Sequence, residues 1–377
     1  MTRLAFRAGV PLLAVLATAG IAEIGLRLAG PAWLRERMVA MAAGSVVVGE
    51  TVDTAQFGER REGAFVRFKP GVAFALIDPE FHTTVHVTDL GTRVTGTEAR
   101  GAAHVAFLGD SFTFGYGVED NDAFVSVLCR TMGVACLNLG LPGSTLATEV
   151  DLISRRHAEV GRPRLYVVGF FAGNDLIESL TYDARQHDQA PGPRSPARER
   201  ILALNRLVNT TPWLQRLYVL QLAKSAAVHV LSRDLVAVDP MFQTARDAGG
   251  PFGAEARASF ARHLDRLVRL RGDDGFEIVF LMIPDRHQVY PAKMEATAAF
   301  YGLDPNALDM SFPQRMLAPL LEARGIPYVD LLGCLRASGD PDLYYRMDSH
   351  FTANGHRAAA RCAVDALRPL VARVAGE

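Results

Sequence analysis

Short apolar segments alternate with amphipathic ones from Gly101 to the end of the chain. The apolar segments are 104–108, 134–139, 165–170, 277–283 and 326–331. Strands that lie between two layers of helices are apolar along almost their whole length, as they are in parallel sheets. The alternation of such strands with helices predicts a three-layer α/β domain.

Periodicity places two of the intervening helices. One presents apolar side chains at positions i, i+4, i+7 and i+8, namely Phe260, Leu264, Leu267 and Val268. We predict that it ends at Gly272, because glycine commonly terminates helices. The last helix is expected to begin after Thr352, a good N-cap residue, and to keep an alanine-rich face apolar. Pro369 is predicted to bend or end it.

The first thirty residues have the layout of a membrane-targeting segment. Arg3 and Arg7 precede fifteen uncharged residues, 8–22, which suit the apolar part of a signal peptide. Continued to Ala29, the helix has 22 residues and a length of about 33 Å, enough to cross a bilayer. Because no small-residue cleavage site precedes a polar start, we predict an uncleaved anchor over 1–30 and an extracytoplasmic body. A cleaved signal peptide and a buried helix of a soluble body are the alternatives.

Two stretches break the alternation of strands and helices. Residues 31–99 contain short alternating runs and are predicted to form a strand-rich lead-in. Residues 182–199 are polar and rich in proline, whereas 201–230 are apolar. We expect one domain over 100–377 with a helical insertion at about 178–255. Whether this insertion is a lid, a membrane-facing helical pair or ordinary core packing stays open.

The composition excludes some classes of function. The 40 basic and 41 acidic side chains nearly cancel, to a net charge of −1. A nucleic-acid-binding protein normally has a strongly basic face, so this balance gives no support for such a partner. A hydrophobic fraction of 49% is enough for a large core. We expect a globular protein without a nucleic-acid partner, and the sequence leaves its oligomeric state unknown.

Four cysteines, Cys129, Cys136, Cys334 and Cys362, fit an oxidising compartment. Disulfide bonds and free buried thiols are equally good interpretations, and any pairing stays open. No CxxC pair occurs, so we expect no structural zinc site. No cluster of histidine, cysteine and aspartate in the sequence suggests another metal, and we expect no cofactor.

The segment 108–117, LGDSFTFGYG, carries the first candidate for chemistry. Ser111 follows an apolar strand within a glycine-containing turn. That position lies at the carboxyl edge of the sheet, where open α/β sheets bind their ligands. A serine there attacks an acyl carbon only when a neighbouring base takes its proton. The alternative role of Ser111 is that of a helix-capping residue.

The next two strands also end in polar turns. Gly143 lies in NLGLPGS after the second strand, and Asn174 lies in GND after the third. The backbone N–H of Gly143 and the side-chain amide of Asn174 are donors that can stabilise an oxyanion beside Ser111. We therefore predict an oxyanion hole formed by these three residues. Each of the two new residues alone is also a common turn former.

The candidate base lies just before the last helix, in DSHFT. His350 follows the last strand and can take the proton of Ser111. Asp348, two residues earlier, can orient the imidazole and stabilise its charged form. His356 is expected to be a helix-face residue. Four elements that each follow a strand in the proper order make coincidence a poor explanation.

With these motifs the chain resembles the SGNH hydrolase superfamily, the GDSL esterases and lipases, over about residues 101–371 apart from the insertion. Ser111 in GDSF matches the family nucleophile, with Phe112 in place of the usual leucine. Gly143 and Asn174 match the family's oxyanion-hole glycine and asparagine. His350 matches the histidine that deprotonates the serine. The resemblance implies a flavodoxin-like α/β/α fold with a five-stranded parallel sheet.

One departure separates the chain from the common family pattern. Asp348 stands two residues before His350, where the family usually has three. This Asp-x-His spacing resembles a branch that includes membrane-tethered polysaccharide O-acetyltransferases of the alginate type. The segment 283–291, IPDRHQVYP, is also similar to that branch. It is either a loop at the substrate edge or an ordinary β–α connection.

Three functions are compatible with these residues. The first, which we expect, is a membrane-anchored extracytoplasmic serine esterase with the catalytic triad Ser111, His350 and Asp348, acting on an ester or an acylated glycan or lipid. The second is an O-acyltransferase that modifies a cell-envelope polysaccharide. The third is an inactive SGNH domain that serves as a binding module. The presence of the complete set of site residues argues against the third.

Overall fold

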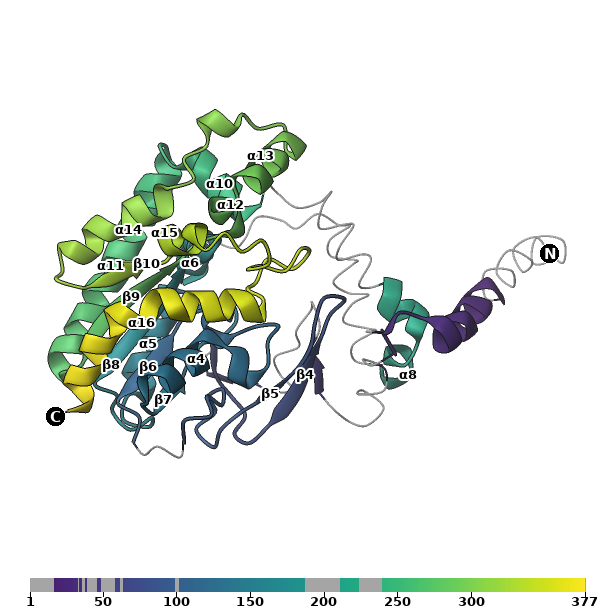
Figure 1. Ribbon diagram of the computed structural model, residues 1–377, viewed down its shortest axis with the longest axis horizontal. Helices are drawn as coiled ribbons and strands as arrows, with labels where there is room; N and C mark the ends of the chain where they lie inside the picture. The colour runs from purple at the N-terminus through teal and green to yellow at the C-terminus, as the bar shows by residue number, and fades with distance from the viewer. Residues whose placement is uncertain are drawn as a thin grey trace. The chain divides into compact units, whose positions relative to one another are not determined.

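The computed structural model describes residues 17–32, 34–35, 38, 46–48, 58–61, 64–98, 102–186, 211–223 and 239–376 (Figure 1). The chain divides into two compact units. One contains residues 1–52, 77–82 and 191–236, and the other contains residues 53–76, 83–190 and 237–377. All the predicted site residues belong to the second unit.

The centre of the second unit is a five-stranded parallel sheet. Its strands are β6 (Val105–Leu108), β7 (Cys136–Asn138), β8 (Leu165–Phe171), β9 (Glu277–Ile283) and β10 (Tyr328–Asp330). Each strand coincides with one of the five predicted apolar segments to within two residues. In the order β10-β9-β8-β6-β7, the second strand, β7, lies on one side of β6, and β8, β9 and β10 follow one another on the other side. This is the flavodoxin-like order, so the predicted α/β fold is confirmed.

Helices cover both faces of this sheet (Figure 1). On one side, α4 (Phe124–Met132) packs against α16 (Ala353–Ala375). The other layer is built around α11 (Pro251–Asp274), whose neighbours include α5 (Leu146–Arg156), α6 (Asp175–Gln186) and α14 (Phe312–Glu322). Crossovers between parallel strands are nearly always right-handed, and helices on both faces are the usual result. They explain why the strands are apolar on both faces.

Short elements complete the described part of the chain. Within 31–99, β2 (Gly58–Arg61) pairs antiparallel with β3 (Ala64–Phe68), and β4 (Ala73–Ile77) neighbours β5 (His82–His86). The remaining strand is β1 (Val46–Val48). The short helices are α3 (Ser111–Phe114), α8 (Pro212–Gln215), α10 (Pro240–Asp247), α12 (Arg286–Val289), α13 (Pro291–Phe300) and α15 (Leu332–Ala337), with 3₁₀ turns at Asp120–Asp122 and Pro305–Ala307.

The predicted end of one helix is wrong, and one of the two outcomes expected at Pro369 does not occur. α11 continues through Gly272 and ends before Gly275, whose φ of +73° is the left-handed conformation typical of a helix C-cap. α16 begins after Thr352, as predicted, and the Thr352 hydroxyl accepts a hydrogen bond from Gly355 N–H at 3.2 Å. However, Pro369 does not end α16. The helix continues to Ala375 because apolar side chains of its last turns, Val371 and Val374, are buried.

In the first unit, residues 17–29 are helical. Among the described residues, no helix combines the length with the apolar composition that a membrane span requires. Residues 1–16 of the predicted anchor lie outside the described residues, as do 187–210 and 224–238 of the predicted insertion. Glu23 accepts hydrogen bonds from the backbone N–H groups of Tyr218 and Val219, at 3.1 and 3.0 Å. The described segments 17–32 and 211–223 of this unit therefore contact each other.

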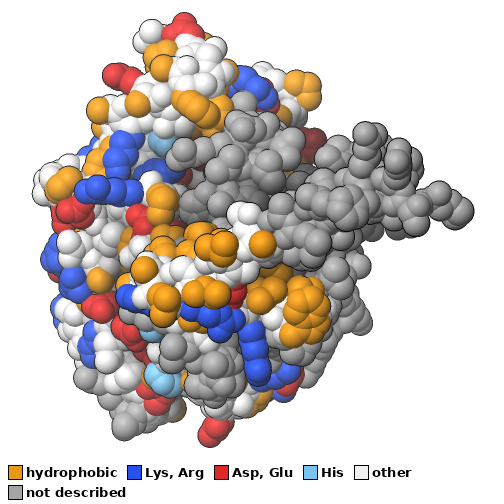
Figure 2. All heavy atoms as spheres, turned by 90° about the vertical axis from the view of Figure 1, so that its right-hand side faces the viewer, with side chains coloured by type: hydrophobic (Ala, Val, Ile, Leu, Met, Phe, Trp, Pro, Cys, Tyr) orange, Lys and Arg blue, Asp and Glu red, His pale blue; other side chains and the backbone are white. Residues whose placement is uncertain are grey.

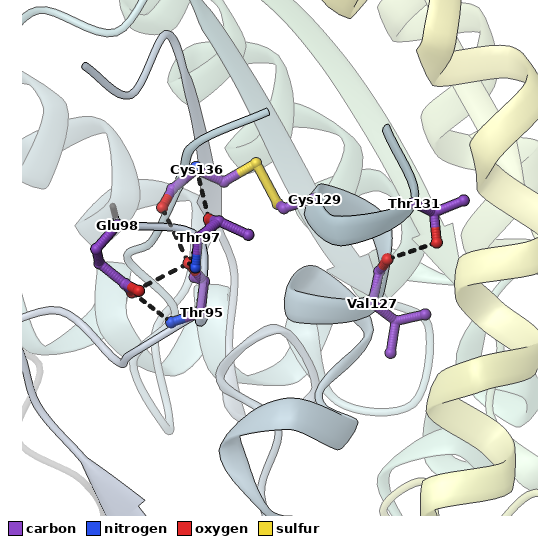
Figure 3. The surroundings of a disulfide bond; sticks show 7 residues. All are labelled: Thr95, Thr97, Glu98, Val127, Cys129, Thr131 and Cys136. Carbon is purple, nitrogen blue, oxygen red and sulfur yellow. Dashed lines mark hydrogen bonds between the residues drawn. A yellow bond between two sulfur atoms is a disulfide. The ribbon is translucent and has the colours of Figure 1, made fainter. Parts of the chain in front are cut away.

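All four cysteines form disulfide bonds. Cys129 on α4 pairs with Cys136 on β7, and Cys334 on α15 pairs with Cys362 on α16. Near the first bond, the Thr97 hydroxyl accepts from the backbone N–H of Cys136 at 3.2 Å (Figure 3). The sequence allowed either disulfide bonds or free buried thiols, and the structure contains the disulfide bonds. They fasten a covering helix to an edge strand and the last helix to its neighbour.

The described surface carries charges of both signs. On the face drawn in Figure 2, basic and acidic side chains are interspersed with hydrophobic ones. Several of the exposed charges are paired, such as Arg357 with Asp122 at 2.8 Å and Arg315 with Asp309. The described residues on that face therefore form no broad basic area of the kind that nucleic-acid-binding proteins present.

Candidate active site

The loop after β6 places Ser111 at the carboxyl end of the sheet. Ser111 is the first residue of α3, and the Asp110 carboxyl group accepts a hydrogen bond from the backbone N–H of Phe112 at 2.9 Å. Gly109 has a φ of +147°, and a Cβ atom there would lie 2.1 Å from Thr113 Oγ1. Only glycine fits this turn, so the GDS motif produces a half-buried serine directly beyond the strand.

His350 and Asp348 lie beside Ser111. Nε2 of His350 is 2.7 Å from Ser111 Oγ, and Nδ1 is 2.6 Å from Asp348 Oδ1. The same carboxylate oxygen accepts a hydrogen bond from the backbone N–H of His350 at 2.9 Å. Because only one residue separates the two, Asp348 contacts both the ring and the backbone of the histidine. The short Asp-x-His spacing therefore still allows the carboxylate to orient the imidazole.

Asp348 and His350 shift each other's pKa. Burial would raise the pKa of Asp348, but the charge and hydrogen bonds of His350 bring it below its usual value. Burial would lower the pKa of His350, but the Asp348 carboxylate, helped by Asp110, raises it above its usual value. Their side chains are 22% and 21% exposed. The imidazole is thus a stronger base than a free histidine, with a fixed counter-ion for its charged form.

The loop that carries His350 is held by its own backbone and by tyrosine hydroxyls. Tyr345 N–H donates to His350 C=O at 3.0 Å, and Thr352 N–H donates to Leu343 C=O at 2.9 Å. The Tyr345 hydroxyl donates to Gly117 C=O at 2.7 Å, in the loop that follows Ser111. These bonds connect the segments of the nucleophile and the base, which are 239 residues apart.

Aromatic rings surround the imidazole of His350. The Phe112 ring is centred 5.0 Å from it and the Tyr116 ring 4.8 Å from it. Phe112 also stacks on Phe171 at the end of β8, at 3.9 Å, and meets Phe351 edge to face at 5.1 Å. The replacement of the family's usual leucine therefore has a structural reason, since Phe112 fills an aromatic cluster between the nucleophile and the histidine loop.

Arg93 is a residue near the site that we did not predict from the sequence. Its side chain is fully buried, and it bonds Asp120 Oδ1 at 2.9 Å. The guanidinium also donates to the carbonyl oxygens of Phe114, Gly115 and Val118. It thereby fixes the loop 114–118, which carries Tyr116. No local pattern around GTRVTGT indicated this role, because its partners lie more than twenty residues away.

The predicted oxyanion donors follow the two neighbouring strands. Gly143 is exposed after β7 with a φ of +75°, which favours glycine although a Cβ atom would meet nothing within 4 Å. Its loop is joined to the nucleophile turn because Leu141 N–H and the Ser144 hydroxyl both donate to Gly109 C=O, at 2.9 and 2.7 Å. Asn174 follows β8, and its Nδ2 donates to Glu178 Oε1 at 2.9 Å.

Four carboxyl groups lie behind these loops, and Asp110, Glu149 and Asp175 are buried whereas Glu178 is half-buried. Burial raises the pKa of Asp110 to about 6, of Glu178 to about 7 and of Glu149 to about 8. It raises the pKa of Asp175 well above its usual value, and the three other carboxyls raise it further. No group of three or more histidine, cysteine or acidic side chains in the described part of the chain is arranged to hold a metal ion. The sequence reasoning missed these acids because each lies in an ordinary helix or turn.

The segment 283–291 forms a capped β–α connection. Asp285 caps α12 and its Oδ1 lies 2.7 Å from Nδ1 of the buried His287. The segment contacts the histidine loop, because Arg286 Nη1 donates to Arg346 C=O at 3.2 Å and the Tyr344 hydroxyl donates to Pro284 C=O at 2.7 Å. His356 lies on the buried face of α16 and accepts a hydrogen bond from Phe124 N–H at 3.2 Å. The geometry thus brings neither of these histidines to Ser111.

The family model of the SGNH hydrolase-like domain of the acetyltransferase AlgX matches residues 241–376. The resemblance to the SGNH hydrolases is confirmed. The matched residues include Asp348 and His350. Ser111, Gly143 and Asn174 precede them and are joined to them by the contacts described above.

Solved structures similar to this chain include a member of the lipolytic protein G-D-S-L family from Veillonella parvula DSM 2008, the psychrotrophic esterase EstA from Pseudoalteromonas sp. and the acetyl xylan esterase AlAXEase. Their sequence identities to the chain are 12%, 9% and 11%. The matches cover 70%, 71% and 70% of this chain and 97%, 97% and 98% of theirs, with TM-scores of 0.37, 0.38 and 0.37. No curated protein matches the chain.

Proposed function

We propose that this protein is a serine esterase that cleaves carboxylic esters through an acyl-enzyme formed on Ser111. The observation that carries the proposal is the hydrogen-bonded chain from Asp348 through His350 to Ser111, with separations of 2.6 and 2.7 Å. Over such distances a base can take the proton of a nucleophile. The resemblance to the SGNH hydrolases supports the same chemistry.

In the first half-reaction, Ser111 Oγ forms a bond to the acyl carbon while its proton moves to Nε2 of His350. Asp348 accepts the Nδ1–H hydrogen bond and stabilises the imidazolium. Charge develops on the acyl oxygen, where the backbone N–H groups of Ser111 and Gly143 and the amide of Asn174 are the proposed donors. The tetrahedral intermediate collapses when His350 returns the proton to the leaving alcohol.

In the second half-reaction, His350 takes a proton from water, and the resulting hydroxide attacks the acyl-enzyme. The acid is released and Ser111 regains its proton. If a sugar hydroxyl replaces water, the same residues perform O-acyl transfer. The match to the AlgX acetyltransferase model favours this second candidate. If acyl transfer to an added polysaccharide is faster than hydrolysis, the protein is an O-acyltransferase.

The proposal includes a location outside the cytoplasm, with the N-terminal segment as a membrane anchor. The basic start followed by fifteen uncharged residues supports the anchor. The disulfides Cys129–Cys136 and Cys334–Cys362 support an oxidising compartment, because such bonds are rare where thiols are kept reduced. An acylated glycan or lipid of the cell envelope is the substrate class that fits this location.

The pH dependence of hydrolysis follows from His350. The imidazole must be neutral to accept the serine proton, so kcat/KM should rise with pH through the pKa of His350. Because Asp348 raises that pKa, the midpoint of this rise should lie above the usual histidine value of about 6.5. Asp348→Asn should move it below the wild-type midpoint, since burial then acts without the carboxylate. A pH–rate profile of both proteins checks the shift, and equal midpoints would contradict it.

A fluorophosphonate probe tests the proposed function directly. We expect the wild type to react with the probe and to hydrolyse a short 4-nitrophenyl ester, whereas Ser111→Ala should do neither. Ser338→Ala, which removes an exposed serine at the end of α15, should behave as the wild type. Folded wild-type protein that takes up no probe would contradict both enzyme functions and would favour the inactive binding module.

A further inference from the structure

The side chain of Asn174 has a freedom that the other two oxyanion donors lack. The N–H groups of Ser111 and Gly143 belong to the backbone, whose direction is set by their turns. An asparagine amide can rotate by about 180° and exchange the positions of its nitrogen and oxygen. In the flipped state it would present an acceptor to an oxyanion. An active oxyanion hole therefore needs a partner that fixes the Asn174 amide.

Glu178 is the residue that contacts this amide. It lies one turn further along α6, and its Oε1 accepts the hydrogen bond from Asn174 Nδ2 at 2.9 Å. Asn174 Oδ1 is buried and has no hydrogen-bond partner among the described residues. Within that part of the chain, Glu178 is thus the one hydrogen-bonding group that distinguishes the two orientations of the amide.

An ionised carboxyl group strongly favours one of the two orientations of the Asn174 amide. It only accepts hydrogen bonds, so it selects the amide nitrogen and repels the amide oxygen. Because Nδ2 carries two hydrogens, one is used by Glu178 and the second stays available for an oxyanion. Glu178 also lies in the first turn of α6, where the helix dipole favours negative charge.

The groups around Glu178 govern its ionisation. Burial raises its pKa to about 7, the charge of Asp110 raises it too, and the hydrogen bond from Asn174 opposes the rise. Asp175 on the same helix and Glu149 on α5 belong to the same acidic group. On the helix α11, which packs against α6, Arg262 and His263 pair with Asp183. With a pKa of about 7, Glu178 is increasingly a carboxylate as the pH rises above 7.

We propose that Glu178 is a positioning residue for ester cleavage, which holds the amide of Asn174 so that its second N–H serves the oxyanion. The inference rests on the proposed function and adds a residue that no motif of the chain includes. Glu178 touches no reacting atom in this scheme. Glu178 is proposed to affect the rate only by positioning Asn174, and this dependence on Asn174 can be measured.

A double-mutant cycle tests whether Glu178 acts only through Asn174. The variants are Glu178→Met, which keeps the length of the side chain but has no strong acceptor, Glu178→Gln, which keeps an acceptor, and Asn174→Ala, alone and combined with Glu178→Met. Asp183→Asn is the matched control, since Asp183 lies on the same helix and bonds His263 and Ser259 instead of the site. Rates are normalised to active sites titrated with the fluorophosphonate probe, so that unfolded protein does not count.

We expect Glu178→Met to lower kcat about 10- to 100-fold with little change in KM, below the loss from removal of a whole donor. Glu178→Gln should recover most of that loss, because its amide oxygen can still accept from Asn174. In the Asn174→Ala background, Glu178→Met should cause no further loss of kcat. Asp183→Asn should change thermal stability and leave the normalised kcat near the wild-type value.

Other results would overturn the inference. An equal loss from Glu178→Met in the presence and absence of Asn174 would show that Glu178 acts by another route. An unchanged kcat in both Glu178 variants would show that it has no role in the reaction. If wild-type protein neither hydrolyses esters nor takes up the probe, the proposed function fails first and the inference falls with it.

Discussion

Replacement of His350 by alanine is expected to lower kcat for ester hydrolysis by about 10⁴- to 10⁶-fold. The reason is that Nε2 of His350 is the base 2.7 Å from Ser111 Oγ. Without it the hydroxyl remains a weak nucleophile, and the leaving alcohol receives no proton. His287 and His356 cannot substitute, because both are buried and bonded elsewhere. Steady-state hydrolysis of a 4-nitrophenyl ester measures the loss.

Asp348→Asn should lower kcat by about 10³- to 10⁴-fold, because an amide holds the wrong imidazole tautomer and no longer stabilises the imidazolium. The matched control is His86→Ala, which removes an exposed histidine that also pairs with an aspartate, Asp120, at 2.7 Å. This control should keep the wild-type kcat.

A His350→Ala protein with more than about a tenth of the wild-type rate would assign the base to another residue.

The strands could be predicted from the sequence because the fold buries them on both faces. All four residues of β6 and all seven of β8 are buried, so their apolar character is continuous and carries no competing period. Ends of parallel strands meet at one edge of the sheet, and this rule was enough to bring Ser111 and His350 to the same place. Their predicted proximity depended on topology and not on local sequence.

Helix ends were harder to predict because local signals compete with packing. Gly272 and Gly275 are both plausible stops, but only Gly275 adopts the left-handed conformation. Pro369 interrupts one backbone hydrogen bond of α16, yet the buried residues beyond it keep the helix intact. In α16 the tertiary contacts of the last turns decided the outcome, whereas α11 ends where Gly275 adopts the left-handed conformation.

The supporting residues of the site could not be predicted, since each depends on which distant loops meet. Arg93 bonds a loop that begins 21 residues later, and Phe112 stacks on the end of a strand 59 residues away. Glu178 is close to Asn174 in sequence, but its importance depends on the partly buried position of both side chains. A glutamate four residues after an asparagine is otherwise an ordinary helical pair.

Arg93→Met is expected to lower the free energy of unfolding by about 3–5 kcal/mol, the cost of breaking a buried ion pair by removing one partner. The guanidinium is fully buried, and its loss leaves three carbonyl oxygens of the loop 114–118 without their donor. Activity should fall too, because this loop carries Tyr116, which contacts the His350 ring. Urea unfolding followed by circular dichroism, together with ester hydrolysis, measures both effects.

Two further variants distinguish the contribution of the buried Arg93 hydrogen bonds to stability from the contribution of a positive charge alone. Arg93→Lys keeps a charge that can reach Asp120, but a single ammonium cannot serve three carbonyls as well, so an intermediate loss is expected. Arg357→Met makes the same chemical change at an exposed pair with Asp122, where the loss should stay below about 1 kcal/mol. If Arg93→Met were as mild as Arg357→Met, the loop 114–118 would hold its shape without the arginine. The contact between Tyr116 and His350 would then have to be maintained by the histidine loop itself, through the bond from Tyr345 to Gly117.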